Sequence, residues 1–450
     1  MLASRPLWLR DPLAILAEGA AAGGVVVADG RIVELVPRGG RPGTPDAAMF
    51  DASAHVVLPG LINTHHHFYQ TLTRACPPAL DKALFPWLVA LYPIWARLTP
   101  ERLRLAVRVA LAELLLSGTT TTSDHHYVFN DALADAIDTE IEEATALGMR
   151  LVATRGSMSL GEDQGGLPPR TVVQREDAIL ADCERLIARH HQTGPGAMTQ
   201  VALAPCSPFS VTDGLMRDSS ALAARTGVRL HTHLAETRDE EDWCRARFGC
   251  RPVDYLERVG WLDDRVWLAH GIWFDAGEIA RLGRARVAVS HCPTSNMILA
   301  SGCCPVRGLE QAGAPVGLGV DGSASNDSSN LIETARHAFL LQRLMHGAEH
   351  ISHKDALRWA TRGSAACLGR DDIGAIAPGL QADLALYRLD ELRFSGAGDP
   401  LAALVLCGAS RADRVMVGGR WVVEDGAIPG LDLPALIHAH SRAATELRQI

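Results

Sequence analysis

Short apolar stretches separated by turn residues mark both ends of the chain. Near the N-terminus, GGVVVADGRIVELVPRGG alternates apolar runs with turns, and Asp29-Gly30 is typical of a hairpin turn. Near the C-terminus, GAIAPGLQADLALYRLD and RVMVGGRWVVEDGAI have the same character, with Gly418-Gly419 as a second hairpin turn. We expect a small β unit at each end, and the two could pair into one sheet.

Between these ends, short apolar strands alternate with longer stretches of helical period such as ERLRLAVRVALAELLLSG. This alternation favours βα units and a parallel sheet. Eight strands are predicted, the number that closes a (β/α)8 barrel. They are VVLPGLINTH (56–65), GTTTTSDHH (118–126), MRLVATRGS (149–157), TQVALAPCS (199–207), VRLHTHLAE (228–236), VWLAHGIW (266–273), VAVSHCPTS (287–295) and VGLGVDGSAS (316–325).

The predicted strands begin with plain apolar residues, and nearly all end in His, Asp, Cys, Ser or Arg. Active sites of such barrels lie at the carboxyl ends of the strands, so this distribution indicates chemistry there. A doubly wound open sheet is the alternative architecture. No glycine-rich phosphate loop follows the first strand, which disfavours it.

Composition narrows the class of protein. With 47% hydrophobic and 21% charged residues, the 450-residue chain can bury a large core. Its net charge is −9 and its basic residues are scattered, which favours neither a nucleic-acid nor an anionic membrane surface. The ten cysteines show no CxxC spacing, as expected for reduced thiols in a cytosol.

The first residues are interrupted by Arg5, Arg10 and Asp11, which an apolar signal segment would not tolerate. No window of about 18 uncharged apolar residues occurs, so we expect no membrane span and a cytoplasmic location.

Histidines and acids at the strand ends are the candidate chemistry. Because strand residues alternate between faces, His65 and His67 share one face and His66 takes the other. His233 and Glu236 follow the fifth strand, and His231 lies one layer deeper, as a core or supporting histidine. The sixth, seventh and eighth strands end in His270, His291 and Asp321.

Each of these residues alone is more typical of a satisfied core polar group than of a ligand. Together, gathered at one end of a barrel, they form the set that a hydrolytic metal needs.

Five motifs in order carry a family resemblance: PGLINTHHH, HTHLAE, LAHG, HCPTSN and GLGVDGSAS. They resemble the amidohydrolase superfamily and, within it, the branch of cytosine, guanine and methylthioadenosine deaminases. The resemblance implies a distorted (β/α)8 barrel with a small composite β-sandwich made by both ends of the chain. The expected bounds are 1–58 for the N-terminal part of the sandwich, 59–370 for the barrel, and 371–450 for the C-terminal part with a terminal helix.

The resemblance also implies the site. His65, His67, His233 and Asp321 would bind one divalent metal, foremost Zn²⁺ with Fe²⁺ as the alternative. His270 would contact the reacting oxygen and Glu236 would shuttle protons, with Asp321 accepting the proton of the water. The fourth strand, VALAPCSPF, lacks the lysine that bridges two metals in binuclear members, and Lys82 and Lys354 lie far from any strand end. A binuclear centre is therefore disfavoured.

The expected reaction is hydrolytic deamination, in which hydroxide adds to the amino-bearing carbon of a heterocycle and ammonia leaves. The zinc deaminase design of His-x-Glu with Pro-Cys-x-x-Cys is absent, because Pro205-Cys206 has no second cysteine.

Two segments bear on the substrate, the aromatic-rich 65–101, which we expect to fold over the site, and SDHHYVFN at 123–130. Both resemble bacterial 8-oxoguanine deaminases and, less closely, hydroxylated s-triazine aminohydrolases. Guanine and isocytosine are further candidates. By the same resemblance Gln70 is the first choice for substrate binding, together with Glu236 and His270.

Other side chains near the expected mouth have open roles. Arg155 could meet a ring carbonyl or pair with a neighbouring carboxylate. Trp95 and Tyr127 could stack on the base, although Trp95 also fits a core position. His125 and His126 lie near the mouth without an assigned role.

Three hypotheses follow: a purine deaminase, a triazine aminohydrolase, and a non-catalytic barrel used for binding. The third would usually have lost part of its metal set, whereas every expected position is filled here. For an enzyme we expect a small heterocyclic substrate, no nucleic-acid or membrane partner and, by family resemblance, a homo-oligomer, a dimer or higher.

Overall fold

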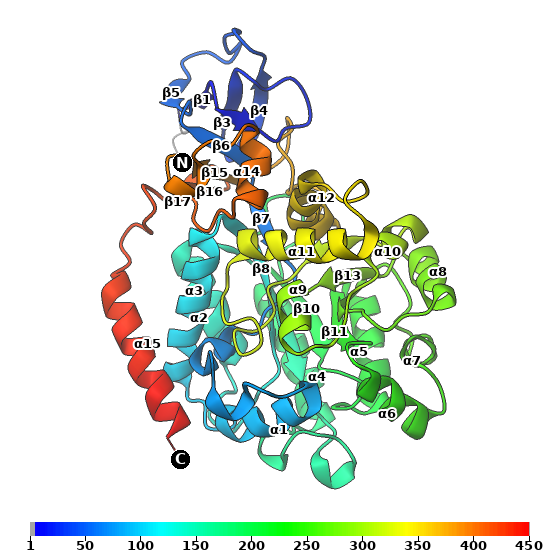
Figure 1. Ribbon diagram of the computed structural model, residues 1–450. Helices are drawn as coiled ribbons and strands as arrows, with labels where there is room; N and C mark the ends of the chain where they lie inside the picture. The colour runs from blue at the N-terminus through cyan, green and yellow to red at the C-terminus, as the bar shows by residue number, and fades with distance from the viewer. Residues whose placement is uncertain (1–4, 450) are drawn as a thin grey trace.

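A barrel of eight parallel strands forms the centre of the protein, which is described over residues 5–449 by a computed structural model. The strands follow one another around the sheet in sequence order, and helices cover the outside (Figure 1). Their bounds are β7 (Leu61–Asn63), β8 (Thr119–His126), β9 (Arg150–Ser157), β10 (Thr199–Pro205), β11 (Arg229–Leu234), β12 (Val266–His270), β13 (Ala288–His291) and β14 (Val316–Leu318). Each falls within a predicted strand, so the predicted barrel is confirmed.

Backbone hydrogen bonds join the last strand to the first. The Thr64 amide donates to the Leu318 carbonyl at 2.9 Å, and the Asp321 amide donates to the His65 carbonyl at 3.0 Å. The end of the eighth predicted strand therefore lies beside the end of the first, which brings Asp321 to His65.

Helices and short helical turns fill the connections. Helix α2 begins where the Thr99 side chain accepts the Arg102 amide and Pro100 takes the first position, a favoured start for a helix. The α-helices are α1 (Leu84–Trp95), α2 (Pro100–Leu116), α3 (Ala136–Leu147), α4 (Glu176–His190), α5 (Asp213–Thr226), α6 (Arg238–Phe248), α7 (Pro252–Arg258), α8 (Ala276–Ala285), α9 (Pro293–Ile298), α10 (Val306–Ala312), α11 (Leu331–His346), α12 (His353–Arg358), α13 (Ser364–Cys367), α14 (Pro400–Leu406) and α15 (Leu433–Arg448). The shorter turns are η1 (Phe68–Thr73), η2 (Pro77–Ala79), η3 (Glu162–Gln164), η4 (Arg170–Val172), η5 (Trp359–Gly363) and η6 (Leu392–Phe394).

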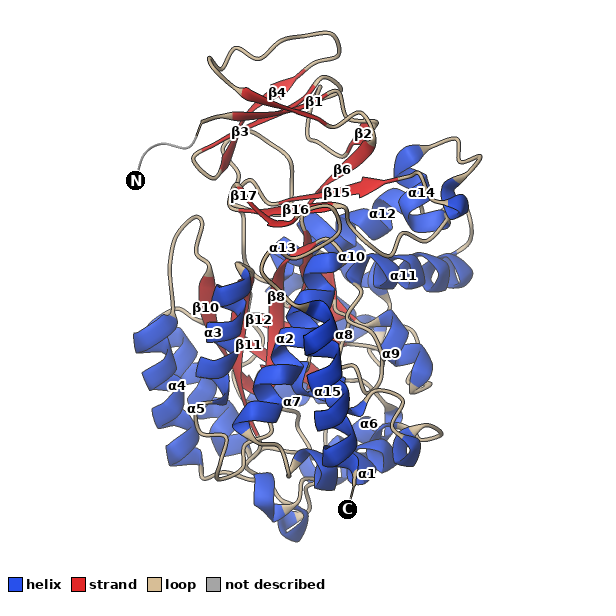
Figure 2. Ribbon diagram, turned by 90° about the vertical axis from the view of Figure 1, so that its left-hand side faces the viewer, coloured by secondary structure: helices blue, strands red, loops and turns tan. Residues whose placement is uncertain are grey.

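Two smaller sheets lie at one end of the barrel, opposite helix α1 (Figures 1 and 2). One has four strands in the order β4-β3-β1-β5, and the other has five in the order β17-β16-β15-β6-β2. Their strands are β1 (Leu7–Arg10), β2 (Ala14–Ile15), β3 (Gly24–Ala28), β4 (Arg31–Val36), β5 (Ala48–Asp51), β6 (His55–Pro59), β15 (Leu384–Arg388), β16 (Arg414–Val417) and β17 (Arg420–Val423). In the five-stranded sheet β6 pairs antiparallel with β15, so both ends of the chain share one sheet, as predicted.

Both predicted hairpin turns are present. Asp29 and Gly30 have φ angles of 47° and 77° between β3 and β4, and Gly418 and Gly419 have 53° and 78° between β16 and β17. Left-handed angles at both positions match the twist of a tight hairpin.

The first predicted strand, 56–65, is two strands. Its first half is β6 of the five-stranded sheet and its second half is β7 of the barrel. Gly60 separates them, and a Cβ there would lie 2.2 Å from the Thr120 side chain. The change of sheet therefore needs a residue without a side chain, and the domain division at 58 and 59 stays a prediction.

A buried ion pair links the barrel to the five-stranded sheet. The Arg150 guanidinium at the start of β9 donates to Asp383, just before β15, at 2.7 Å.

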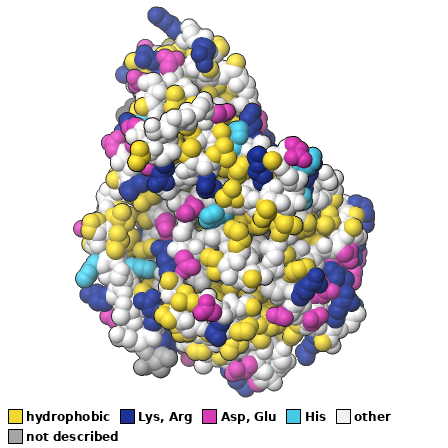
Figure 3. Space-filling view, in the orientation of Figure 1, with side chains coloured by type: hydrophobic (Ala, Val, Ile, Leu, Met, Phe, Trp, Pro, Cys, Tyr) yellow, Lys and Arg dark blue, Asp and Glu magenta, His cyan; other side chains and the backbone are white. Residues whose placement is uncertain are grey.

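Helix α15 lies along the outside of α2 (Figures 1 and 2). In the face drawn in Figure 3, acidic and basic side chains are interspersed. Over residues 5–449, the helices lack the length and hydrophobicity needed to cross a bilayer.

Candidate metal centre and active-site cavity

The four predicted metal ligands meet at the carboxyl ends of the barrel strands. Nε2 of His65 and Nε2 of His67 each lie 3.3 Å from Oδ1 of Asp321. Nε2 of His233 lies 3.2 Å from Nε2 of His67. Four side chains from three strand ends thus place one atom each around a common point.

Hydrogen bonds behind these rings fix which nitrogen faces that point. Nδ1–H of His67 donates to the His125 carbonyl at 2.7 Å, and Nδ1–H of His233 donates to the Cys206 carbonyl at 2.7 Å. In each ring Nε2 therefore carries a lone pair. Two lone pairs 3.2 Å apart repel each other unless a cation lies between them.

His65 is oriented through a second histidine. Nδ1–H of His231 donates to the Trp267 carbonyl at 2.8 Å, so its Nε2 accepts from Nδ1–H of His65, also at 2.8 Å. This leaves Nε2 of His65 buried with no hydrogen-bond donor. His231 therefore has the supporting position expected of it, since ligand histidines are held by a partner on the other ring nitrogen.

The donor set fits a divalent cation. Burial lowers the pKa of His65 and of His233 well below the ordinary value, which keeps both imidazoles neutral and able to bind a metal. Tetrahedral ligands at zinc distances of 2.0–2.1 Å are separated by roughly 3.3–3.4 Å, close to the separations observed. Three imidazoles and one carboxylate suit Zn²⁺ and also Fe²⁺.

Glu236 and His270 lie beside this centre. Nε2 of His270 is 3.5 Å from Oε2 of Glu236 and 3.9 Å from Oδ2 of Asp321. Nδ1–H of His270 donates to Oδ1 of Asn296 at 3.0 Å, which turns Nε2 toward the two carboxyl groups. Burial, with the Asp321 charge adding to it, raises the pKa of Glu236 well above the ordinary value. Glu236 is thus a carboxyl group that keeps its proton to a higher pH than an ordinary glutamate does.

Backbone strain is concentrated at these strand ends. His270, Asp321 and Ala235, the residue before Glu236, have φ angles of 69°, 66° and 53°. Residues other than glycine rarely adopt such angles, and each costs about 1–3 kcal/mol. Held by the surrounding barrel, this strain turns the polar side chains toward the centre.

A cavity adjoins the centre, with about 390 Å³ not filled by protein atoms, its open mouth included. Five polar side chains of the centre reach it: His67, His233, Glu236, His270 and Asp321. The other lining residues are Gln70, Leu84, Trp87, Leu88, Tyr92, Tyr127, Cys206, Phe209, Leu299 and Ser325. The side chains of α1 cover one side, as expected for the aromatic-rich segment.

Gln70 contributes an unpartnered amide to the cavity. Its Oε1 accepts the Ala324 amide at 3.3 Å, while its Nε2 is buried without a partner. A Cβ at position 322 would lie 1.9 Å from Oε1, so Gly322 makes room for this side chain. The free NH₂ of Gln70 can donate to a ligand.

Arg155 is not brought to the cavity. Its Nε donates to Asp182 of α4 at 2.7 Å, and another nitrogen donates to Gln174 at 3.0 Å. Arg155 lies beside His126 in the register of β8 and β9, on the helix-facing side of the barrel wall. Of the two roles open from the sequence, the structure therefore favours the ion pair with a neighbouring carboxylate.

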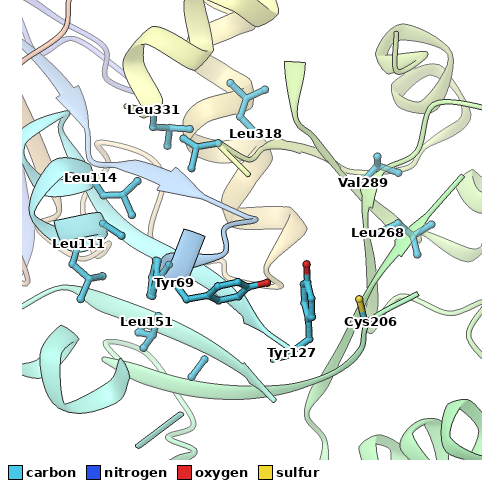
Figure 4. Packing of buried hydrophobic residues seen from close by; sticks show 14 of the residues in the cluster. Tyr69, Leu111, Leu114, Tyr127, Leu151, Cys206, Leu268, Val289, Leu318 and Leu331 are labelled. Atoms are coloured by element: carbon cyan, nitrogen blue, oxygen red, sulfur yellow. The ribbon is translucent and has the colours of Figure 1, made fainter. Parts of the chain in front are cut away.

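Of the two aromatic residues predicted to stack on the base, one lies at the cavity and the other in the core. Tyr127 lines the cavity, and Figure 4 shows it near Tyr69 and Cys206. Trp95 is fully buried and its Nε1–H donates to Thr73 at 3.2 Å, which places it in the core.

The three histidines of open role lie in three environments. The ring of His125 stacks on His233 with centroids 4.7 Å apart, beside the centre. His126 faces Glu140 of α3. Nε2 of His291 accepts from Gln342 at 3.3 Å.

Sequence reasoning missed Tyr92. Its hydroxyl is buried without a hydrogen-bond partner, and the ring lines the cavity. The spacing of Leu84, Leu88 and Tyr92 along one face of α1 was the available signal, but the same spacing is typical of a core helix.

Comparison with known proteins agrees with this geometry. The amidohydrolase family model matches residues 56–422, most of the chain. The chain belongs to the amidohydrolase family. This membership establishes the hydrolytic class of the enzyme.

Three members of the family illustrate its range. An 8-oxoguanine deaminase of Pseudomonas aeruginosa is 66% identical over 98% of both chains. A hydroxydechloroatrazine ethylaminohydrolase of Pseudomonas sp. (strain ADP) is 38% identical over 92% of this chain and 89% of that protein. The crystal structure of an atrazine chlorohydrolase of Arthrobacter aurescens TC1 complexed with zinc has a TM-score of 0.91 at 32% identity, covering 97% of this chain and 100% of that chain.

Proposed function

We propose that this enzyme hydrolyses the exocyclic amino group of 8-oxoguanine, giving urate and ammonia. The observation that carries the proposal is the 66% identity to an 8-oxoguanine deaminase over nearly the whole of both chains. The hydroxydechloroatrazine ethylaminohydrolase is 38% identical.

We propose His65, His67, His233 and Asp321 as the ligands of one divalent cation, Zn²⁺ first and Fe²⁺ second. When bound there, the cation would supply Lewis-acid chemistry, lowering the pKa of a water from 15.7 to about 7. The support is the set of inward-facing imidazole lone pairs, which among the described residues face one another and the Asp321 carboxylate.

The other roles follow from position. Oδ2 of Asp321 faces His270 and is placed to accept the proton of the attacking water. Glu236, with its raised pKa, gives its proton to a ring nitrogen and then relays to the departing amino group the proton that Asp321 took from the water. It recovers a proton from the hydroxyl on the ring carbon as that carbon becomes a carbonyl and ammonia leaves. Nε2 of His270, turned toward the centre by the contact of Nδ1–H with Asn296, accepts a hydrogen bond from the water and so orients its oxygen toward the ring carbon.

Gln70 and Tyr92 would recognise the substrate. Both offer buried donors that have no partner among residues 5–449, in a cavity whose other walls are largely apolar. A planar heterocycle with carbonyl oxygens or ring nitrogens at its edge would satisfy them, while the rings of Tyr127 and Phe209 contact its faces.

The test is ammonia release by metal-loaded protein with 8-oxoguanine, guanine, isocytosine and a hydroxylated triazine, each at several concentrations. We expect kcat/KM to be highest for 8-oxoguanine, with urate formed in equal amount to ammonia. Glu236→Gln protein measured in parallel gives the background. Turnover of the triazine alone would transfer the assignment to the aminohydrolase alternative.

A further inference from the structure

A second group of possible metal ligands lies on the helix-facing side of the barrel wall. Asp124 and His126 are two residues apart on β8, and Glu140 is on α3. All three side chains have 0% exposure. One ligand atom from each lies within 4.8 Å of the other two, and the group shares no residue with the catalytic ligands.

Hydrogen bonding leaves this cluster rich in acceptors. Nε2–H of His126 donates to the Val128 carbonyl at 2.8 Å, so Nδ1 carries a lone pair. That nitrogen lies 3.2 Å from Oε1 of Glu140, which is also an acceptor. Including Oε2 of Glu140 and Oδ2 of Asp124, four buried acceptor atoms have no donor among the described residues.

The charge of the cluster is also uncompensated by side chains. Two carboxyl groups meet one imidazole. Arg155 is close enough to influence His126, but its guanidinium is engaged by Asp182 at 2.7 Å and by Gln174. Buried carboxylates without a counter-ion are strongly destabilising, so the cluster needs positive charge from elsewhere.

We propose that Asp124, His126 and Glu140 bind a second divalent cation, of the class that accepts one imidazole together with carboxylate oxygens, such as Zn²⁺ or Mn²⁺. The nitrogen ligand disfavours Mg²⁺ and Ca²⁺, which prefer oxygen alone. The 3.2 Å between Nδ1 of His126 and Oε1 of Glu140 is close to the separation of neighbouring ligands on one such ion.

This ion would hold the backbone that orients a catalytic ligand. Oδ1 of Asp124 accepts the amide of Phe68, the residue after His67, at 2.7 Å. The carbonyl of His125, between Asp124 and His126, accepts Nδ1–H of His67 at 2.7 Å. The second cation thus has a positioning role and touches no reacting atom.

Protons on the two carboxyl groups are the alternative to a metal ion in this cluster. Burial raises the pKa of Glu140 to about 8 and raises that of Asp124 well above its ordinary value. With both carboxyl groups protonated, Asp124 could donate to Glu140 and Glu140 to His126, which would neutralise the cluster without a metal. Counting ions per chain separates these two occupants directly.

The experiment measures Zn, Mn and Fe per chain by mass spectrometry in full-length protein expressed with all three metals and dialysed against metal-free buffer. The variants are Glu140→Gln, the double variant His65→Ala/His233→Ala, and all three changes together. Glutamine keeps the shape of Glu140, and its NH₂ can donate to His126, so this variant preserves packing. We expect two ions in the unmodified protein, one in each of the first two variants and none in the combination.

One ion in the unmodified protein, kept by Glu140→Gln and lost by His65→Ala/His233→Ala, would overturn the proposal. One ion lost by Glu140→Gln but kept by the double variant would support the second site and instead contradict the catalytic centre. If Glu140→Gln does not fold, the double variant decides alone: a retained ion supports the proposal and none overturns it.

Discussion

The barrel wall at strand β8 separates two clusters of histidine and acidic side chains that differ in their access to solvent. Toward the centre, His125 stacks on His233, and the residues that reach the cavity retain some exposure: 3% for His67 and Glu236, 4% for Asp321 and 8% for His233. On the helix-facing side, Asp124, His126 and Glu140 have none. The residue types are similar, so access decides which cluster can meet a substrate.

The side chains on the two sides of the barrel wall also differ in the hydrogen bonds that hold them. The cavity side is held by carbonyls and by His231, which orient ring nitrogens toward one point. The helix-facing side has unpartnered acceptors and an arginine engaged elsewhere. Substitutions on either side can test this comparison, and the largest effects on turnover are expected on the cavity side.

Removing two ligands should have the largest effect. In His65→Ala/His233→Ala we expect deaminase activity to fall by on the order of 10⁴-fold or more, because a water with unlowered pKa is a poor nucleophile. Ammonia release at saturating substrate measures this, with circular dichroism as the control for folding. Substantial activity in the folded variant would contradict the catalytic centre.

Loss of the proton carrier Glu236 should have the second-largest effect on turnover. Glu236→Gln keeps the shape of the side chain but cannot exchange a proton, so we expect kcat to fall by about 10²–10⁴-fold. Metal content should match that of the unmodified protein, since Glu236 is not among the proposed ligands. A rate within a fewfold of the unmodified enzyme would remove Glu236 from the mechanism.

His231, which accepts the Nδ1–H of His65, should affect activity through the affinity for the metal. His231→Ala removes the acceptor of Nδ1–H of His65. We expect the metal dissociation constant to rise by about 10–100-fold, as for other partners of ligand histidines. Titration of metal-free protein measures it, and excess metal should restore most of the activity. Unchanged affinity would show that His65 needs no such partner.

Substrate recognition by the covering helix should give a smaller effect. Tyr92→Phe removes only the buried hydroxyl, so KM for 8-oxoguanine should rise by about 3–10-fold, the loss of one hydrogen bond. Trp95→Phe on the same helix is the packing control: Trp95 lies in the core against the ring of Tyr92, and this change should raise KM less than Tyr92→Phe does. Equal effects of the two changes would indicate general loosening of α1 instead of a contact.

The smallest effect on turnover is expected on the helix-facing side. Arg155→Met breaks the ion pair with Asp182 and should lower the free energy of unfolding by roughly 1–3 kcal/mol. KM should stay within about twofold, since Arg155 does not line the cavity. A large rise in KM with little change in stability would restore Arg155 as a substrate-binding residue.

The barrel and the convergence of its polar strand ends could be predicted because they depend on local patterns. Apolar strands with polar carboxyl ends are visible in the sequence, and alternation along a strand separates His65 and His67 from His66. The same alternation, applied to β8 and β9, would have placed His126 and Arg155 together on the helix-facing side.

Other features depend on contacts between distant segments. The apolar spacing of α1 is the same whether the helix faces a core or a cavity, so Tyr92 could not be selected in advance. The pairing of Glu140 with His126 joins α3 to β8. The division of the first predicted strand at Gly60 depends on Thr120, which approaches from the neighbouring strand.

The antiparallel pairing of β6 with β15 has a consequence for synthesis of the protein. β6 precedes every barrel strand, whereas β15 follows them all, more than 300 residues later. While the ribosome makes the intervening chain, β6 lacks this neighbour. The backbone N–H and C=O groups along that edge of an apolar strand are then free to pair with other strands. Nascent chains shorter than about 390 residues should therefore depend most on chaperones, and the completed sheet forms only near the end of translation.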